Sequence, residues 1–141
     1  MKTTTTWTGK MGFIGHNPSG HEIAMDAAEE IGGENNGSRP TELLLQAVAG
    51  CTAIDIVSIL KKMRVEPIRF DTEIEAERAD EHPRKFTKIH IHYSLDGDIP
   101  EKKLVRAIRL SKDEYCSVSH TLNAEITASY SLNGEQGTLD V

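Results

Sequence analysis

Two cysteines are the residues of this chain best suited to covalent chemistry. They are Cys51 and Cys116, the only cysteines among the 141 residues, and they stand 65 positions apart (116 minus 51). A pair of this kind in a reducing compartment is either two small buried hydrophobic residues or two redox-active thiols. Spacing alone does not bring the sulfurs within disulfide reach, so both interpretations stay open at this point.

Each cysteine is followed four positions later by a residue that could influence its thiol. Asp55 shares a helix face with Cys51, where a carboxylate would raise the pKa of the thiol. The alternative is that Asp55 is a buried polar anchor, hydrogen-bonded to a hairpin or to a partner chain. His120 could orient or activate Cys116, or it could be a solvated or structural residue.

Two other histidines, His90 and His92, alternate on one face of an expected strand. A zinc site there would need a third ligand such as His21 or His82. Exposed strand histidines are the simpler interpretation, and we expect no metal. The sequence also lacks a glycine loop or a nucleotide fingerprint, and so we expect no cofactor.

Composition narrows the class of protein. The net charge is -6 and the pI is about 5.5, which argues against nucleic-acid binding. The N-terminus lacks an apolar segment of signal-peptide length. The longest apolar stretch, residues 43–60, is interrupted by polar side chains, which argues against a simple membrane span; these are Gln46, Thr52, Asp55 and Ser58. We therefore expect a soluble cytoplasmic protein with one domain over residues 1–141.

The elements that must position the cysteines follow from hydrophobic periodicity. An N-terminal β-meander is expected from strands over 3–8, 13–16 and 21–25, and a loop over 27–39 precedes a long central helix over 40–64. Alternating residues then predict a β-hairpin, followed by a second helix and a final strand; these fall at 68–78, 86–95, 101–114 and 124–132. This order predicts an α+β fold.

The long helix carries Cys51 and is apolar nearly all round. Such a helix is expected to be buried. Cys116 is expected where the second helix ends, just before a short helical turn at 117–122. On the second strand of the hairpin, Ile89 and its alternating neighbours should face the core.

Two segments resemble a known family. Residues 39–53, RPTELLLQAVAGCTA, resemble the first-cysteine helix of the OsmC/Ohr family (osmotically inducible and organic hydroperoxide resistance proteins). Residues 115–122, YCSVSHTL, resemble its second-cysteine motif. The order of elements matches as well, so the resemblance covers essentially the whole chain.

The resemblance implies a function. Cys51 would be the peroxidatic thiol and Cys116 the resolving thiol of a peroxidase that reduces organic hydroperoxides. The cycle passes through a Cys51 sulfenic acid and a Cys51–Cys116 disulfide, which a lipoyl-type dithiol reopens. The family also forms an intertwined homodimer with sites at the interface.

The family activates its thiolate with an arginine from the N-terminal hairpins, paired with a glutamate near the start of the long helix. In this chain Lys10 and Arg39 are the candidate cations, and Glu42 is the candidate carboxylate, because Thr41 occupies the position of the family's glutamate. These departures motivate an alternative function. The chain would then be an OsmC-like, stress-related binding module without peroxidase turnover, holding an apolar ligand at the dimer interface.

Overall fold

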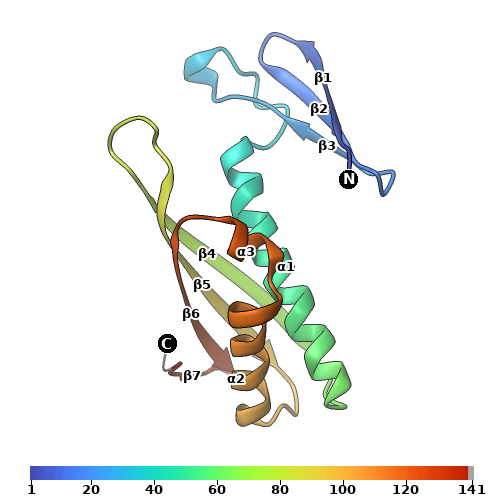
Figure 1. The fold of residues 1–141 in the computed structure, drawn as a ribbon, viewed down its shortest axis with the longest axis vertical. Coiled ribbons are helices and arrows are strands. Elements are labelled where there is room, and N and C mark those ends of the chain that lie inside the picture. The colour runs from blue at the N-terminus through green and yellow to red at the C-terminus, as the bar shows by residue number, and fades with distance from the viewer. Residues whose placement is uncertain (140–141) are drawn as a thin grey trace. The chain divides into compact units, whose positions relative to one another are not determined.

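The computed structural model describes residues 1–139 and divides into two compact units, Met1–Leu45 and a second unit that begins at Gln46 (Figure 1). The mixed α+β architecture predicted from the sequence is confirmed, with two sheets and three α-helices among the described residues. That the units form one domain over residues 1–141 stays a prediction.

The first unit is the predicted antiparallel meander. Its strands are β1 (Thr4–Gly9), β2 (Gly12–His16) and β3 (Glu22–Met25), in the order β1-β2-β3. The threonine run of β1 suits a strand because β-branched side chains pack well on a pleated surface. The turn between β1 and β2 places Lys10 in the left-handed region, with φ 49°.

The segment after β3 is organised by Asp26, which is only 4% exposed. Its carboxylate accepts hydrogen bonds from the backbone N–H groups of Ala27, Glu34 and Asn36, at 2.8, 3.0 and 3.1 Å. The bonds from Asn36 and Glu34 hold the pKa of the Asp26 carboxyl below its ordinary value. The predicted loop is therefore an ordered one, with a short 3-10 helix, η1 (Glu29–Ile31), inside it.

Helix α1 (Pro40–Lys62) begins with a residue suited to the first helical position. Glu42 is the third residue of the helix, and its Oε1 atom accepts a hydrogen bond from the backbone N–H of Arg39, the residue before the helix, at 2.7 Å. This is the carboxylate half of a capping box. Lys61 and Lys62 suit the C-terminal end of the helix dipole.

The second unit is built on a mixed sheet with the order β4-β5-β6-β7. The strands are β4 (Arg69–Arg78), β5 (Phe86–Asp96), β6 (Glu125–Leu132) and β7 (Glu135–Gly137). β5 and β6 are parallel, and the other neighbouring pairs are antiparallel. β7 was not predicted, because its three residues are polar or glycine and show no alternation of apolar and polar side chains.

A parallel pair needs a crossover connection. Between β5 and β6 this connection holds α2 (Glu101–Leu110), a π-helical turn η2 (Ser111–Tyr115) and α3 (Ser117–Thr121). In Figure 1, α1 and α2 lie across the same side of the sheet. The core sits between these layers. Eight of its larger apolar side chains are at most 2% exposed; they are Ile56, Leu60, Ile89, Ile91, Tyr93, Leu95, Leu104 and Ile108.

The opposite face of the sheet is polar, as the alternation of β5 predicts. His90 contacts the hydroxyls of Thr127 and Ser129 through Nδ1 and Nε2, at 2.7 and 2.9 Å. His92 contacts Ser129 and Ser131 at 2.6 and 2.8 Å. The two histidines therefore belong to a hydrogen-bonded ladder between parallel strands.

The long helix differs from the prediction in its burial. Val48, Thr52, Ile56 and Leu60 are buried on one face, whereas Ile54 is 71% and Val57 41% exposed. By length and composition α1 could cross a membrane, and only 22% of its most apolar window is buried inside the described chain. The expectation of burial all round is wrong for the single chain, because hydropathy does not reveal which chain covers a face.

Candidate active site

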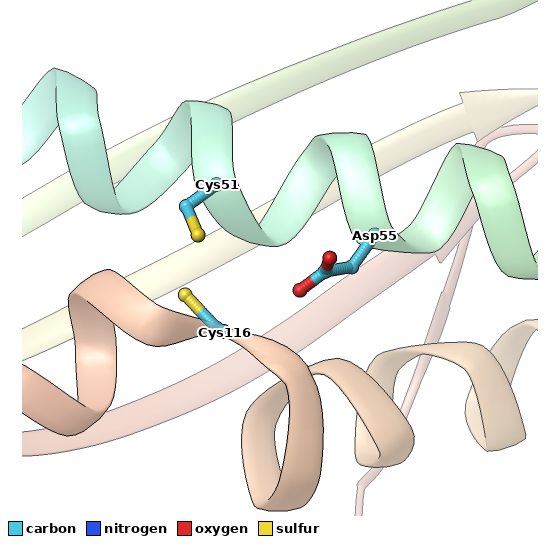
Figure 2. Close-up of side chains that lie close together, drawn as sticks. All are labelled: Cys51, Asp55 and Cys116. Atoms are coloured by element: carbon cyan, nitrogen blue, oxygen red, sulfur yellow. The ribbon is translucent and has the colours of Figure 1, made fainter. Parts of the chain in front are cut away.

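Cys51 and Cys116 face each other between α1 and the junction of η2 with α3. Figure 2 shows the two sulfurs pointing toward one another and the Asp55 carboxylate pointing into the same space. The two Sγ atoms and a carboxylate oxygen of Asp55 all lie within 4.8 Å of one another. Both thiols are free; Cys51 is half-buried and Cys116 is fully buried. Spacing in the sequence could not show that these cysteines lie close together, and the fold does.

The π-helical turn places Cys116. The backbone N–H of Cys116 donates to the carbonyl of Ser111 at 2.8 Å, which closes a ring one residue wider than an α-helical turn. Cys116 then leaves the helical region, with φ -72° and ψ 101°, and becomes the N-cap of α3. Its Sγ accepts a hydrogen bond from the backbone N–H of Ser119 at 3.4 Å. The thiol is thus fixed by backbone on both sides.

Asp55 lies one helical turn after Cys51. Its Oδ2 atom accepts a hydrogen bond from the Ser111 hydroxyl at 2.9 Å, and the same hydroxyl lies 3.4 Å from the carbonyl oxygen of Thr52. Asp55 is therefore a hydrogen-bonded anchor, as one of the two interpretations has it. Its partner, however, is the end of α2 rather than a hairpin or a second chain.

The protonated form of Cys51 is favoured by its surroundings. Burial is the largest factor that raises the pKa of the Cys51 thiol above its ordinary value. The Cys116 side chain and the negative charge of Asp55 raise this pKa further, while the backbone N–H of Val118 opposes them. The expected effect of Asp55 on the thiol is confirmed in direction.

A buried hydroxyl pair lies beside the thiols. Tyr93 of β5 is 2% exposed, and its burial raises the pKa of its phenol to about 12 against an opposing hydrogen bond with Thr52. Thr52 itself donates to the carbonyls of Val48 and Ala49, at 3.1 Å each. The hydroxyls of Tyr93 and Thr52 are uncharged near neutral pH, so they place polar but un-ionised groups beside the thiols.

The His120 ring contacts the backbone of Cys116. Its Nδ1 atom lies 2.8 Å from the Cys116 carbonyl oxygen, within the short helix α3. This contact supports the structural interpretation of His120.

The three remaining predicted site residues belong to the N-terminal unit. Lys10 forms an exposed ion pair with Glu34, with Nζ and Oε2 3.3 Å apart. The guanidinium of Arg39 donates to the Asn35 side chain and the Gly37 carbonyl, at 2.9 and 3.2 Å. Glu42 accepts from the Arg39 backbone, as described above. Their action on the Cys51 thiol stays a prediction.

Ser111 and the π-helical turn were missed by the sequence reasoning. Ser111 continues the buried stripe of α2, seven positions after Leu104 and three after Ile108, and it is only 1% exposed. A small polar residue on an otherwise apolar buried stripe is a usable signal for a buried hydrogen bond. The π-turn itself has no such signal.

Comparisons with known proteins agree with the fold. Residues 33–131 match the family model of OsmC-like protein. Protein YhfA of Escherichia coli is 36% identical over 135 residues, which cover 93% of this chain and 96% of YhfA. The crystal structure of a hypothetical protein from Aquifex aeolicus superposes with a TM-score of 0.82 at 28% identity and covers 93% of this chain and 94% of its own.

A more distant solved structure has a name that refers to organic hydroperoxides. It is an organic hydroperoxide resistance protein from Legionella pneumophila, 14% identical, with a TM-score of 0.66 over 94% of this chain and 96% of its own. At that identity the likeness shows the fold alone. The family match covers most of the chain, and together with YhfA it shows that this protein belongs to the OsmC-like family.

Proposed function

We propose that the protein is a thiol-dependent peroxidase that reduces organic hydroperoxides through Cys51 and Cys116. The observation that supports this most is the approach of the two free thiols to within 4.8 Å, with Cys51 half-buried and Cys116 fully buried. The more accessible sulfur suits the attack on substrate. The buried sulfur, held by backbone hydrogen bonds, suits the second step, in which a sulfenic acid and a thiol condense to a disulfide and release water.

The steps balance without any metal or organic cofactor. The Cys51 thiolate attacks the outer peroxide oxygen, the O–O bond breaks, and the alkoxide leaves with a proton as an alcohol. The Cys51 sulfenic acid then condenses with the Cys116 thiol, forming the S–S bond and releasing water. A dithiol reductant of the lipoyl type reopens the disulfide by two exchange steps and becomes a cyclic disulfide.

The thiolate needs a cation, because burial and Asp55 both favour the thiol. Lys10 or Arg39 is proposed for this role, with Glu42 holding the cation. Either cation could come from the same chain or from a second copy. An exposed ion pair such as Lys10–Glu34 costs little to break, typically no more than about 1 kcal/mol, so Lys10 can exchange partners.

A homodimer is proposed because α1 presents large apolar side chains that the described chain leaves uncovered; they include Leu44, Ile54 and Val57. A second copy that covered this face would complete the burial that the sequence predicts. The same apolar walls suit fatty or bulky alkyl hydroperoxides. A soluble, cytoplasmic protein is proposed, since free thiols persist in a reducing compartment.

Counting thiols during peroxide treatment tests this function. The reduced protein is mixed with a modest excess of cumene hydroperoxide, and free thiols are titrated over minutes. Both thiols are expected to disappear, and a dihydrolipoyl compound is expected to restore them. Survival of both thiols would contradict the proposed activity.

Variants separate the roles of the residues. Cys51→Ser should abolish peroxide consumption, whereas Cys116→Ser should stop at a Cys51 sulfenic acid that a dimedone label captures. Lys10→Ala and Arg39→Ala should identify the activating cation by slower consumption. The exposed Lys2→Ala is the matched control for Lys10 and should leave the rate unchanged.

A second function is favoured by the raised pKa of Cys51 and by the exposed apolar face of α1. In this alternative the protein is a stress-related binding module that holds an apolar ligand at the dimer interface and does not turn over peroxide. It predicts saturable binding of an apolar fluorescent probe by the Cys51→Ser variant as well as by the native protein, with no loss of thiols on peroxide addition.

A further inference from the structure

The thiol pair and Asp55 form a constellation that the peroxidase cycle does not fully use. Two thiol sulfurs and a carboxylate oxygen converge on one space, and all three atoms lie within 4.8 Å of one another. Of these three groups, a peroxidase cycle through a disulfide uses only the two sulfurs. We propose that the reduced protein binds one Zn²⁺ or a similar thiophilic divalent cation through Cys51, Cys116 and Asp55.

The donor set fits zinc. Thiolate sulfur and carboxylate oxygen are both ordinary zinc ligands, and three protein ligands with one open position are typical of sites that also bind water or a small anion. Tetrahedral geometry at a zinc–sulfur distance of about 2.3 Å puts the two sulfurs about 3.8 Å apart. The three donor atoms therefore need to contract by only about 1 Å, and Cys51, half-buried, leaves a side of the site open to solvent.

The groups behind the donors already hold them in place. The Ser111 hydroxyl donates to Asp55 at 2.9 Å, and the Ser119 backbone N–H donates to the Cys116 sulfur at 3.4 Å. Such outer hydrogen bonds orient metal ligands in established sites. Asp55 and Cys51 also share one rigid helix, since α1 carries both.

The negative charges of the donor groups also favour a bound cation. Two thiolates and a carboxylate around one space repel one another, and a divalent cation placed between them converts that repulsion into attraction. On binding, each thiol releases its proton to solvent as its sulfur bonds to the metal. No electron is transferred, so the thiols remain reduced.

Metal binding and disulfide formation exclude each other, because both use the same two sulfurs. The metal-bound protein would therefore be protected from peroxide until the metal is removed. This inference requires only the reduced thiols and does not depend on whether the protein is a peroxidase. A protein inert to peroxide could still bind zinc, and an active peroxidase could fail to bind it.

Cobalt spectroscopy and zinc competition test the site. The full-length protein is reduced, stripped with a chelator and titrated with Co²⁺, which gives sulfur-to-cobalt charge-transfer bands and intense visible bands when it is tetrahedral. Zn²⁺ is then added against a chromophoric chelator. We expect one metal per chain, thiolate bands with Co²⁺, and displacement of Co²⁺ by Zn²⁺. Absence of the thiolate bands would overturn the proposal.

The controls change the proposed ligands, by oxidation or by substitution. Oxidation to the disulfide, Cys51→Ser and Cys116→Ser should each remove the thiolate bands or halve their intensity. Asp55→Asn should weaken zinc binding at least about tenfold, and Ser111→Ala by about 10–100-fold, the usual effect of losing an outer hydrogen bond. The exposed Asp98→Asn is the matched control and should bind as the native protein does.

Unchanged zinc affinity in folded Asp55→Asn, as judged by native circular dichroism, would refute the three-ligand site. Equal zinc binding by the oxidised and reduced proteins would refute any role of the thiols. Peroxide consumption measured on the same samples keeps the two conclusions apart.

Discussion

Oxidation of the thiol pair should stabilise the second unit strongly. A Cys51–Cys116 disulfide would close a loop of 66 residues, counted from 51 to 116 inclusive. A cross-link around a loop of that length lowers the conformational entropy of the unfolded chain. In the chain-entropy treatment this raises the free energy of unfolding by about 4 kcal/mol. The sulfurs start within 4.8 Å, so side-chain rotation contributes most of the approach and little strain should offset this gain.

The assay compares urea unfolding of reduced protein with protein treated with one equivalent of hydroperoxide. At an m-value of about 2 kcal/mol per M, a gain of about 4 kcal/mol moves the midpoint by about 2 M. Far-ultraviolet circular dichroism is the suitable probe, because most of the helical residues lie in the second unit. The single tryptophan, Trp7, lies in β1 and reports on the first unit instead.

Both samples are measured at one chain concentration, since association shifts apparent stability. Cys116→Ser treated in the same way is the control and should show no gain. An intrachain disulfide that is verified by mass spectrometry but leaves the midpoint unchanged would refute the reasoning. It would mean that the native geometry resists the bond, or that the unfolded chain is already restricted.

Three further outcomes are expected. With Cys51 as the single thiol, a chelator present and both candidate cations removed by Lys10→Ala and Arg39→Ala, burial and Asp55 should keep the pKa of Cys51 raised. Iodoacetamide should then react more slowly at neutral pH than with a free cysteine, its rate rising only above the ordinary thiol pKa of about 8.5; saturation below that pH would contradict the raised pKa. Asp26→Asn should lower stability at neutral pH. Because the folded pKa of Asp26 is depressed, its stabilisation is present above the unfolded value of about 3.9 and lost as pH falls through the folded one, so native and variant should converge in acid. Tyr130→Phe should cost about 1 kcal/mol, since the buried hydroxyl donates to Glu101, whereas the exposed Tyr115→Phe should change the denaturation midpoint little.

Periodicity was sufficient for β4, β5, α2 and β6 of the second unit, but not for η2 or β7. The alternation of β5 correctly assigned Ile89 to the core and His90 to the outer face, because a strand has a strict period of two. The start of α1 followed from Pro40, whereas the helix ends at Lys62, two residues before the predicted end at 64. The burial of α1 did not follow, since a hydrophobic face gives no indication of whether its own chain covers it.

The candidate site was less accessible to such reasoning. The resemblance to a family, rather than any spacing, paired Cys51 with Cys116. Ser111 enters the site because a π-turn shifts the chain by one residue, and an α-helical pattern does not encode that shift. For Asp55 the sequence offered two interpretations, and the structure supports both: the carboxylate raises the pKa of Cys51, and a contact with the end of α2 anchors it.

The parallel pairing of β5 with β6 has a consequence for biosynthesis. Cys116 lies on the crossover between these strands, and the crossover is secured at its far end only when β6 pairs with β5 in the register Ile89↔Ile126. Pairings of long sequence separation form late, because the entropy of closing the loop is lost before the contacts are gained. A nascent chain still threaded through the ribosome at β6 would carry both cysteines but could not hold them together. We therefore expect the thiol pair to form only after β6 has left the ribosome, so that its closure by an oxidant marks a chain in which β6 is already paired with β5.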